Sequence, residues 1–175
     1  LTGLRAEIGR LNGLLAHVTR GAAWLELGCG TGRDAVAMAR AGARVVACDP
    51  SARMLGVLEG RIRAARLAGR VTALRLGTPS LPALLRRGER RFHGAALLFG
   101  ALNYDPRPEL IAPQLWRLLK PGGTVVVASR NRWCPWEVAY HLFVHPSLRL
   151  AFRRFRRGGA ETDVGGVRVR MRVFS

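Results

Sequence analysis

Short apolar stretches alternate with longer stretches of helical periodicity along the middle of the chain. The apolar stretches have the length of buried strands, and they lie at residues 23–27, 44–48, 71–76, 94–99 and 124–129. Apolar residues recur at helical spacing in the segments between them, at 32–41, 51–67, 81–87 and 108–119. Strands that alternate with helices predict a parallel sheet with helices on both faces. The predicted fold class is therefore α/β, doubly wound and mostly parallel.

The pattern changes toward both ends of the chain. Residues 4–18 carry apolar side chains at helical spacing, which predicts a helix that Gly9 and Gly13 weaken by about 1 kcal/mol each. Beyond residue 130 the alternation gives way to an aromatic and arginine-rich stretch. Valine and methionine then alternate with arginine over 167–174, which predicts a half-exposed or edge strand.

The length of 175 residues allows one domain with a real core and is too short for two. We expect residues 1–130 to form a ligand-binding core and residues 131–175 to form a partial substrate-side insertion or cap of the same domain. The chain starts at Leu1 and stops directly after the last predicted strand, and we expect both ends to be cut.

A glycine-rich turn follows the first predicted strand. Gly28, Gly30 and Gly32 allow the backbone to approach a ligand closely, and the following helix offers unpaired N–H groups at its start. The dinucleotide fingerprint GxGxxG needs its third glycine at position 33, where this chain has Arg33. This spacing argues against NAD.

Asp49 ends the second predicted strand, 21 residues after Gly28. Its carboxylate is placed to accept two hydrogen bonds from a ribose diol. The alternative is a plain glycine-rich turn with a helix-capping aspartate, as in many α/β proteins. The glycine turn and Asp49 together favour a nucleoside-containing ligand over that alternative.

Three ordered segments resemble the class I S-adenosylmethionine-dependent methyltransferases. Trp24 to Gly32, with sequence WLELGCGTG, looks like the first motif of that family, with Glu26 where Asp is more common. Asp49-Pro50-Ser51 followed by Met54-Leu55 is similar to the end of the family's second strand. Leu118 to Gly123, with sequence LLKPGG, is similar to the turn before its fifth strand.

The resemblance implies a Rossmann-like sheet that stops before the usual last two strands, and S-adenosylmethionine as cofactor. It implies that the glycine turn, Cys29 included, lines the methionine moiety, and that Glu26 acts on the cofactor's amino group directly or through water. Asp49 and the adjacent Pro50 belong to the ribose side of the site. Residues 1–130 are then the cofactor-binding core.

Two positions depart from the family pattern. The third strand of the family usually ends in an Asp that accepts from the adenine amino group, followed by a residue with a free N–H; here Thr78 and Pro79 stand there. Threonine is a weaker acceptor and proline has no N–H, so Ser80 is the substitute to consider. At the start of the fourth strand, where the family commonly has an acidic residue, this chain has His93 or Gly94. His93 is predicted to be a surface residue at the start of the strand.

Residues after the fourth strand are the candidates for the reaction itself. Ligands of such sheets bind beyond the carboxyl ends of the strands, which places residues 102–105 beside the transferable methyl. Leu102 is expected to contact the cofactor, and Asn103 and Tyr104 are the candidates for the reaction. A turn capped by Asn103 with Tyr104 as a packing aromatic is an equally good interpretation. Glu137 is placed either to orient an amine or hydroxyl substrate or to favour a helix start.

No metal site is predicted. His141 and His145 share a helical face, but no third ligand accompanies them, so amphipathic packing is favoured. Three cysteines without a CxxC spacing indicate a reduced, cytoplasmic setting. The longest apolar run is far too short to cross a bilayer.

The charge is strongly positive, with 29 Lys and Arg against 11 Asp and Glu, for a net charge of +18. Lys120 is the only lysine, and the arginines are spread along the whole chain. Such a surface attracts nucleic acid, anionic lipid or acidic metabolites without defining a reaction. The stretch 148–157, with five arginines, is a substrate lid, an RNA or anionic-lipid contact, or a solvated face.

The motifs and the resemblance favour methyl transfer from S-adenosylmethionine to an unidentified, small-molecule acceptor. Nucleic-acid binding is expected to be weak and non-specific, because no recognised RNA-binding module occurs. The rival is a degenerate, non-catalytic module with the cofactor fold that binds a partner or nucleic acid through its basic surface. The oligomeric state cannot be read from the residues.

Overall fold

A computed structural model describes residues 20–86, 92–130, 135–144, 146–148, 152, 160–164 and 167–172. The helix predicted at 4–18 lies outside this range. The chain forms two compact units, which are described separately: one is built from Leu1–Leu98 and Arg107–Val127, and the other from Phe99–Pro106 and Ala128–Ser175.

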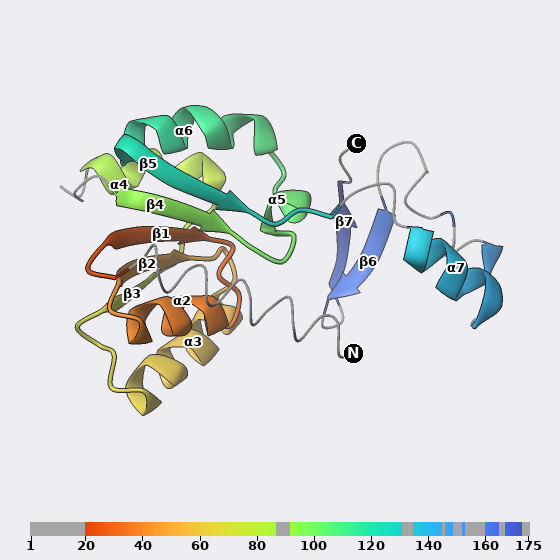
Figure 1. The fold of residues 1–175 in the computed structure, drawn as a ribbon, viewed down its shortest axis with the longest axis horizontal. Helices are drawn as coiled ribbons and strands as arrows, with labels where there is room; N and C mark the ends of the chain where they lie inside the picture. Colours follow the sequence, from red (N-terminus) through yellow and green to blue (C-terminus); the bar gives the residue numbers. More distant parts are fainter. Residues whose placement is uncertain are drawn as a thin grey trace. The chain divides into compact units, whose positions relative to one another are not determined.

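The first unit is built on a five-stranded, fully parallel sheet. Its strands lie in the order β3-β2-β1-β4-β5 (Figure 1). Their bounds are Ala23–Leu27 for β1, Arg44–Cys48 for β2, Val71–Leu74 for β3, Phe92–Leu97 for β4 and Leu119–Val127 for β5. All five strands predicted in the core are therefore confirmed, and so is the α/β class.

Helices connect these strands and cover both faces of the sheet (Figure 1). They are α2 (Arg33–Arg40), α3 (Ala52–Ala64), α4 (Pro82–Arg86) and α6 (Ile111–Leu118), with short 3-10 turns η1 (Thr78–Ser80) and η2 (Pro108–Leu110). Connections between parallel strands are almost always right-handed. Since the strand order reverses direction after β3, α2 and α3 lie on one face and α4 and α6 on the other.

The start of β5 differs from the prediction. A loop was expected at Pro121, Gly122 and Gly123, but the strand begins earlier, where Leu119 pairs with Phe92 of β4. The register shifts between Phe92 and Gly94, and Gly122 takes a φ of 75°. The Pro-Gly-Gly segment is therefore a bulge inside the strand, because a buried Phe92 extends β4 backward and provides a partner.

The centre of the core is the contact between Trp24 and Gly94, which pair across β1 and β4. Trp24 is fully buried, and a Cβ atom on Gly94 would lie 2.6 Å from two ring carbons of Trp24. Gly94 is therefore required because it has no side chain. A positive φ is not the reason, since Gly94 does not have one. The bulky side chain in one strand is accommodated by the missing side chain in the next.

The described residues of the second unit form two helices and a hairpin. Its elements are α5 (Ala101–Tyr104), α7 (Pro135–Phe143), β6 (Ala160–Val164) and β7 (Val167–Met171). β7 confirms the predicted strand over most of its length, and it pairs antiparallel with β6, which the sequence analysis did not predict. None of the described helices has the length and apolar character of a membrane span.

Replacing Gly94 with alanine is expected to destabilise the protein by about 1 to 3 kcal/mol, because the added methyl group overlaps the buried Trp24 ring. The free energy of unfolding from urea titration measures this. Gly56→Ala is the matched control, since Gly56 lies in the middle of α3 with open space around it and should gain about 0.5 to 1 kcal/mol. Equal stability of Gly94→Ala and the wild type would contradict the packing described here.

Candidate cofactor site

The turn after β1 is formed by three glycines with positive φ: 68° at Gly28, 52° at Gly30 and 72° at Gly32. The turn is closed by a hydrogen bond from the Gly32 N–H to the Cys29 carbonyl, with an N···O distance of 2.8 Å. The Cys29 N–H donates to the Cys48 carbonyl at the end of β2, at 3.0 Å. The turn is therefore fixed to both of the strands that flank it.

Two of these glycines meet different surroundings. A Cβ on Gly30 would meet nothing within 4 Å, so open space lies beside this backbone. A Cβ on Gly32 would overlap the side chain of Leu58 in α3. Gly30 thus leaves room for a ligand to approach the main chain, whereas Gly32 allows the start of α2 to pack against α3.

Asp49 connects the ends of β1 and β2. The Gly30 N–H donates to its Oδ2 atom at 2.9 Å, and the Ser51 N–H donates to its Oδ1 atom at 2.8 Å. The cap of α3 is Ser51, whose Oγ accepts from the Met54 N–H at 3.3 Å. Asp49 is therefore not the helix-capping aspartate of the alternative interpretation, and each of its oxygens retains a second lone pair for a ligand.

Glu26 is the second buried carboxyl group of the site, with 2% of its surface exposed. Its Oε2 atom has no hydrogen-bond partner among the described residues. Burial raises the pKa of Glu26 well above its ordinary value; the nearby Asp34 and Asp49 charges raise it further, and a hydrogen bond with the Ala35 backbone opposes them. A buried, unpaired acceptor of this kind favours a cationic partner.

The environment of Cys29 keeps its thiol protonated. Burial is the main reason that its pKa is raised far above the ordinary value, and the charges of Glu26 and Asp49 add to this effect. A thiolate nucleophile is therefore not formed at this position. Cys29 contributes to the site through its backbone.

The remaining predicted residues of the cofactor site lie after β2 and β3. Pro50 is exposed, and its carbonyl accepts from the Arg75 Nε at 3.2 Å. Thr78 is buried at the start of η1, while Pro79 and Ser80 are exposed. The exposed Ser80 hydroxyl is therefore more accessible to a ligand than the Thr78 side chain.

The candidates for the reaction lie on α5 in the second unit, where Leu102 and Tyr104 are half-buried. Asn103 is fully buried, and its Nδ2 donates to the carbonyls of Arg130 at 3.0 Å and Arg172 at 2.6 Å. Its Oδ1 accepts from the Arg130 N–H at 2.7 Å. The amide of Asn103 thus holds α5 to the residues after β5 and β7, a role that the sequence analysis did not predict.

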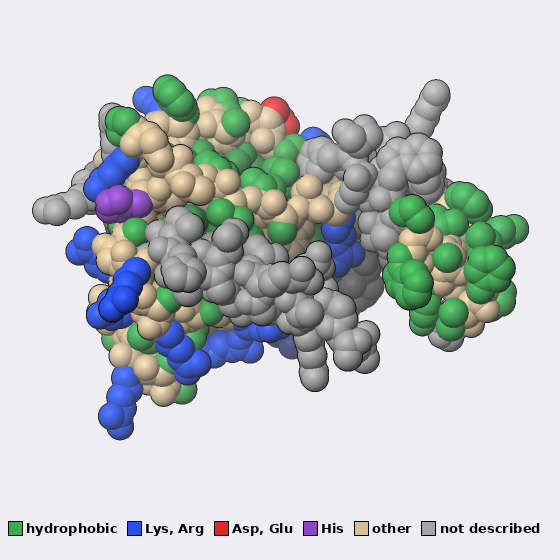
Figure 2. Space-filling view, viewed as in Figure 1, with side chains coloured by type: hydrophobic (Ala, Val, Ile, Leu, Met, Phe, Trp, Pro, Cys, Tyr) green, Lys and Arg blue, Asp and Glu red, His purple; other side chains and the backbone are tan. Residues whose placement is uncertain are grey.

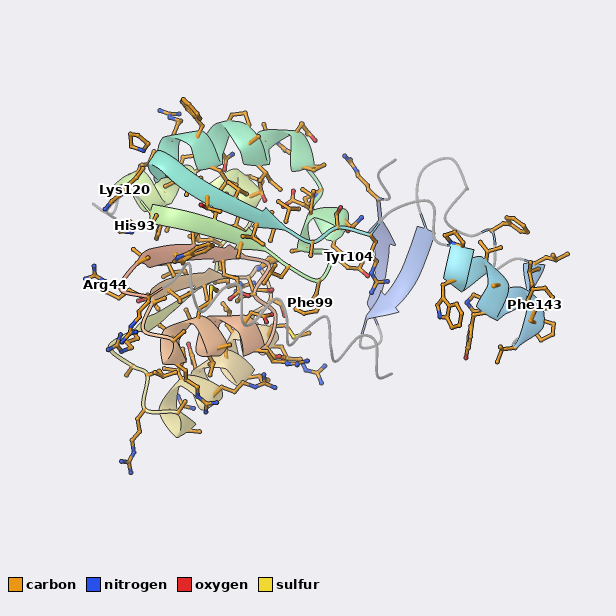
Figure 3. The ribbon with its side chains drawn as sticks, in the orientation of Figure 1. Arg44, His93, Phe99, Tyr104, Lys120 and Phe143 are labelled. Carbon is orange, nitrogen blue, oxygen red and sulfur yellow. The ribbon has the colours of Figure 1, made fainter. Side chains whose placement is uncertain are left out.

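Three further sequence predictions concern residues outside the glycine turn. His93 is exposed near the start of β4, where its Nδ1 accepts from the Ala23 N–H at 3.0 Å and its Nε2 lies 2.9 Å from the Lys120 Nζ (Figure 3). Glu137 is in the first turn of α7. His145 lies outside the described residues, and the described part of the chain has no cluster of His, Cys, Asp or Glu that could hold a metal ion.

The sequence analysis missed one residue that shapes the site. Asp34, in the first turn of α2, is one of the charges that raise the pKa of Glu26. Its own pKa is raised by burial, with the neighbouring Arg33 acting in the opposite direction. The sequence shows Asp34 only as an acidic residue in the first turn of a predicted helix. Such a residue is sufficiently explained by its favourable interaction with the helix dipole.

Comparison with known proteins agrees with this geometry. A family model described as a methyltransferase domain matches residues 25–123, which is more than half of the chain. The chain therefore belongs to the methyltransferase domain family. The fold and the family define the domain as a class I S-adenosylmethionine-dependent methyltransferase domain.

Three similar proteins illustrate the relationship. A demethylmenaquinone methyltransferase from Clavibacter sepedonicus is 39% identical over 108 residues, which covers 60% of this chain and 40% of that protein. The CcbJ methyltransferase of Streptomyces caelestis is 30% identical with a TM-score of 0.59, covering 69% of this chain and 48% of the other. An S-adenosylmethionine-dependent methyltransferase from Thiobacillus denitrificans, solved with S-adenosyl-L-homocysteine, shares the fold at 20% identity with a TM-score of 0.58, covering 80% and 54%. The chain spans about 40% of the length of the curated relatives it matches.

The buried Glu26 predicts a pH-dependent stability. Because its pKa is raised on folding, the folded state favours the protonated carboxyl, and stability is lost as pH rises from the unfolded pKa to the folded pKa. Glu26→Gln removes this group, so the stability of the variant relative to the wild type should increase as pH rises from about 4.5 to neutral. Urea titrations of both proteins at a series of pH values measure the difference. A difference that stays constant with pH would show that Glu26 is not a buried acid with a raised pKa.

Proposed function

We propose that this chain is the cofactor-binding part of an enzyme that transfers a methyl group from S-adenosylmethionine to a small-molecule acceptor. The observation that carries the proposal is Asp49, a carboxylate held by two backbone N–H groups at the ends of β1 and β2. A rigid carboxylate at this edge of a parallel sheet suits the two hydroxyls of a ribose.

The residues present fit the cofactor. The unpaired Oε2 of buried Glu26 suits the ammonium group, and the open space beside Gly30 suits the methionine chain. The glycine turn, which includes Cys29 and Gly32, lines the part of the site for the methionine chain. Pro50 follows the ribose-binding aspartate, and Thr78 with Ser80 belongs to the adenine end.

When bound, the cofactor supplies an electrophilic methyl group on a sulfonium centre. Transfer of that group is an in-line displacement, so the protein contributes mainly alignment of the reactants and exclusion of water. Glu26 and Asp49 would hold the ammonium group and the ribose of the cofactor, on the leaving-group side of the displacement. No catalytic base is needed unless the acceptor must lose a proton.

Residues on α5 are proposed for the acceptor side. Tyr104 carries a hydroxyl and an aromatic surface suited to an acceptor, and Leu102 offers a half-buried apolar side chain. Asn103 is a positioning residue, because its amide is already used in three hydrogen bonds with the backbone. In this proposal residues 131–175 form the cap on the substrate side, and residues 1–130 form the cofactor-binding core.

A small-molecule acceptor is supported by the similarity to a protein named for a demethylated menaquinone. The positive charge adds weak, non-specific attraction to nucleic acid. A cytoplasmic location is supported by the cysteine usage, three residues without a CxxC spacing.

Replacing Asp49 with alanine is expected to weaken binding of S-adenosylmethionine or S-adenosylhomocysteine by about tenfold to a hundredfold, because a charged acceptor is lost from the ribose. Isothermal titration calorimetry of the whole chain measures the affinity, and thermal unfolding in the same buffer checks that the variant is folded. Glu59→Ala is the matched control, since it removes an exposed acidic residue from α3. Unchanged affinity in Asp49→Ala, or tighter binding of NAD than of S-adenosylmethionine, would refute the proposal.

A second pair of variants tests the adenine end. Ser80→Ala should weaken cofactor binding by about three- to tenfold, because it removes the exposed hydroxyl at the end of η1. Thr78→Val keeps the shape of a buried residue and should change the affinity less. A larger loss in Thr78→Val than in Ser80→Ala would reverse this assignment of the adenine contact.

A further inference from the structure

The outer face of α7 is covered by large apolar side chains. Trp136 and Phe143 are 80% and 82% exposed, and Tyr140 between them is also exposed. Val144, directly after the helix, and Leu148, a few residues further on, are exposed apolar residues as well. In Figure 2 the side chains of α7 form a nearly continuous green surface, and Figure 3 shows Phe143 pointing outward from the helix.

These residues share one side of the helix. At about 100° per residue, Trp136, Tyr140 and Phe143 fall within an arc of about 60°. Val138, His141 and Leu142 point to other sides and are half-buried. A helix at the surface of a globular protein usually turns its polar residues outward, so the pattern of α7 is inverted.

The charge of the surrounding chain is predominantly positive. Residues 138–160 contain five arginines and no acidic residue, and residues 128–175 contain ten arginines against three acidic residues. A net positive charge opposes self-association of this part of the chain, because like charges repel. The same charge is complementary to an anionic surface.

We propose that α7 is an interfacial helix that docks this protein on an anionic lipid surface. Trp136, Tyr140 and Phe143 enter the boundary between headgroups and acyl chains, where tryptophan and tyrosine are favoured. The excess of arginines in residues 128–175 adds attraction to the lipid phosphates. The apolar face of α7 and the positive charge are both needed, because each alone gives only weak membrane binding and their binding free energies add.

This inference is independent of methyl transfer, because lipid binding and cofactor binding are measured separately. The experiment is co-sedimentation of the whole chain with vesicles of phosphatidylcholine alone or of phosphatidylcholine with about one third phosphatidylglycerol. The test variant is Trp136→Ser with Phe143→Ser. The matched control is Trp116→Ser with Val57→Ser, which removes an exposed tryptophan and an exposed apolar residue from α6 and α3.

The wild type and the control should bind anionic vesicles at about a tenfold lower lipid concentration than neutral vesicles. The test variant should lose about tenfold or more of its binding to anionic vesicles, with unchanged thermal unfolding and cofactor affinity. Equal binding by the test variant and the control would overturn the proposal in favour of attraction by arginines alone. Absence of vesicle binding would also overturn it, as would self-association of the wild type in sedimentation velocity that the test variant abolishes.

Discussion

The carboxylate of Asp49 is the constraint on which the cofactor edge of the sheet depends. Its two oxygens accept hydrogen bonds from Gly30 and Ser51, so one side chain fixes the turns after both β1 and β2. The positive φ angles of the glycine turn leave backbone N–H groups without the regular partners of a strand or helix. A carboxylate that satisfies one of them converts a flexible glycine segment into a defined surface for a ligand.

Most of the fold of the first unit follows from local sequence. Buried strands of a parallel sheet carry continuous apolar runs, and the helices between them carry one apolar stripe each, so both kinds of element were predictable. The start of β5 was not, because proline and two glycines indicate a turn, whereas pairing of Leu119 with buried Phe92 extends the strand through them. β6 was missed because its sequence, AETDV, has little apolar character, and its strand depends on pairing with β7.

The site was predictable to the extent that its residues lie in local motifs. The glycine turn and Asp49 are recognisable from their spacing alone. Asn103 is different, because its hydrogen bonds reach Arg130 and Arg172, which are 27 and 69 residues away. The burial of Thr78 and the raised pKa of Glu26 likewise depend on packing by distant parts of the chain, which no local pattern records.

The raised pKa of Glu26 also links ligand binding to the pH of the solvent. A cationic group bound beside this carboxyl favours its ionised form, so the pKa of Glu26 falls in the complex and a proton is released. The affinity for such a ligand then increases with pH until Glu26 is ionised in the free protein. The ammonium group of a bound amino acid moiety therefore replaces a proton as the positive charge that compensates the Glu26 carboxylate.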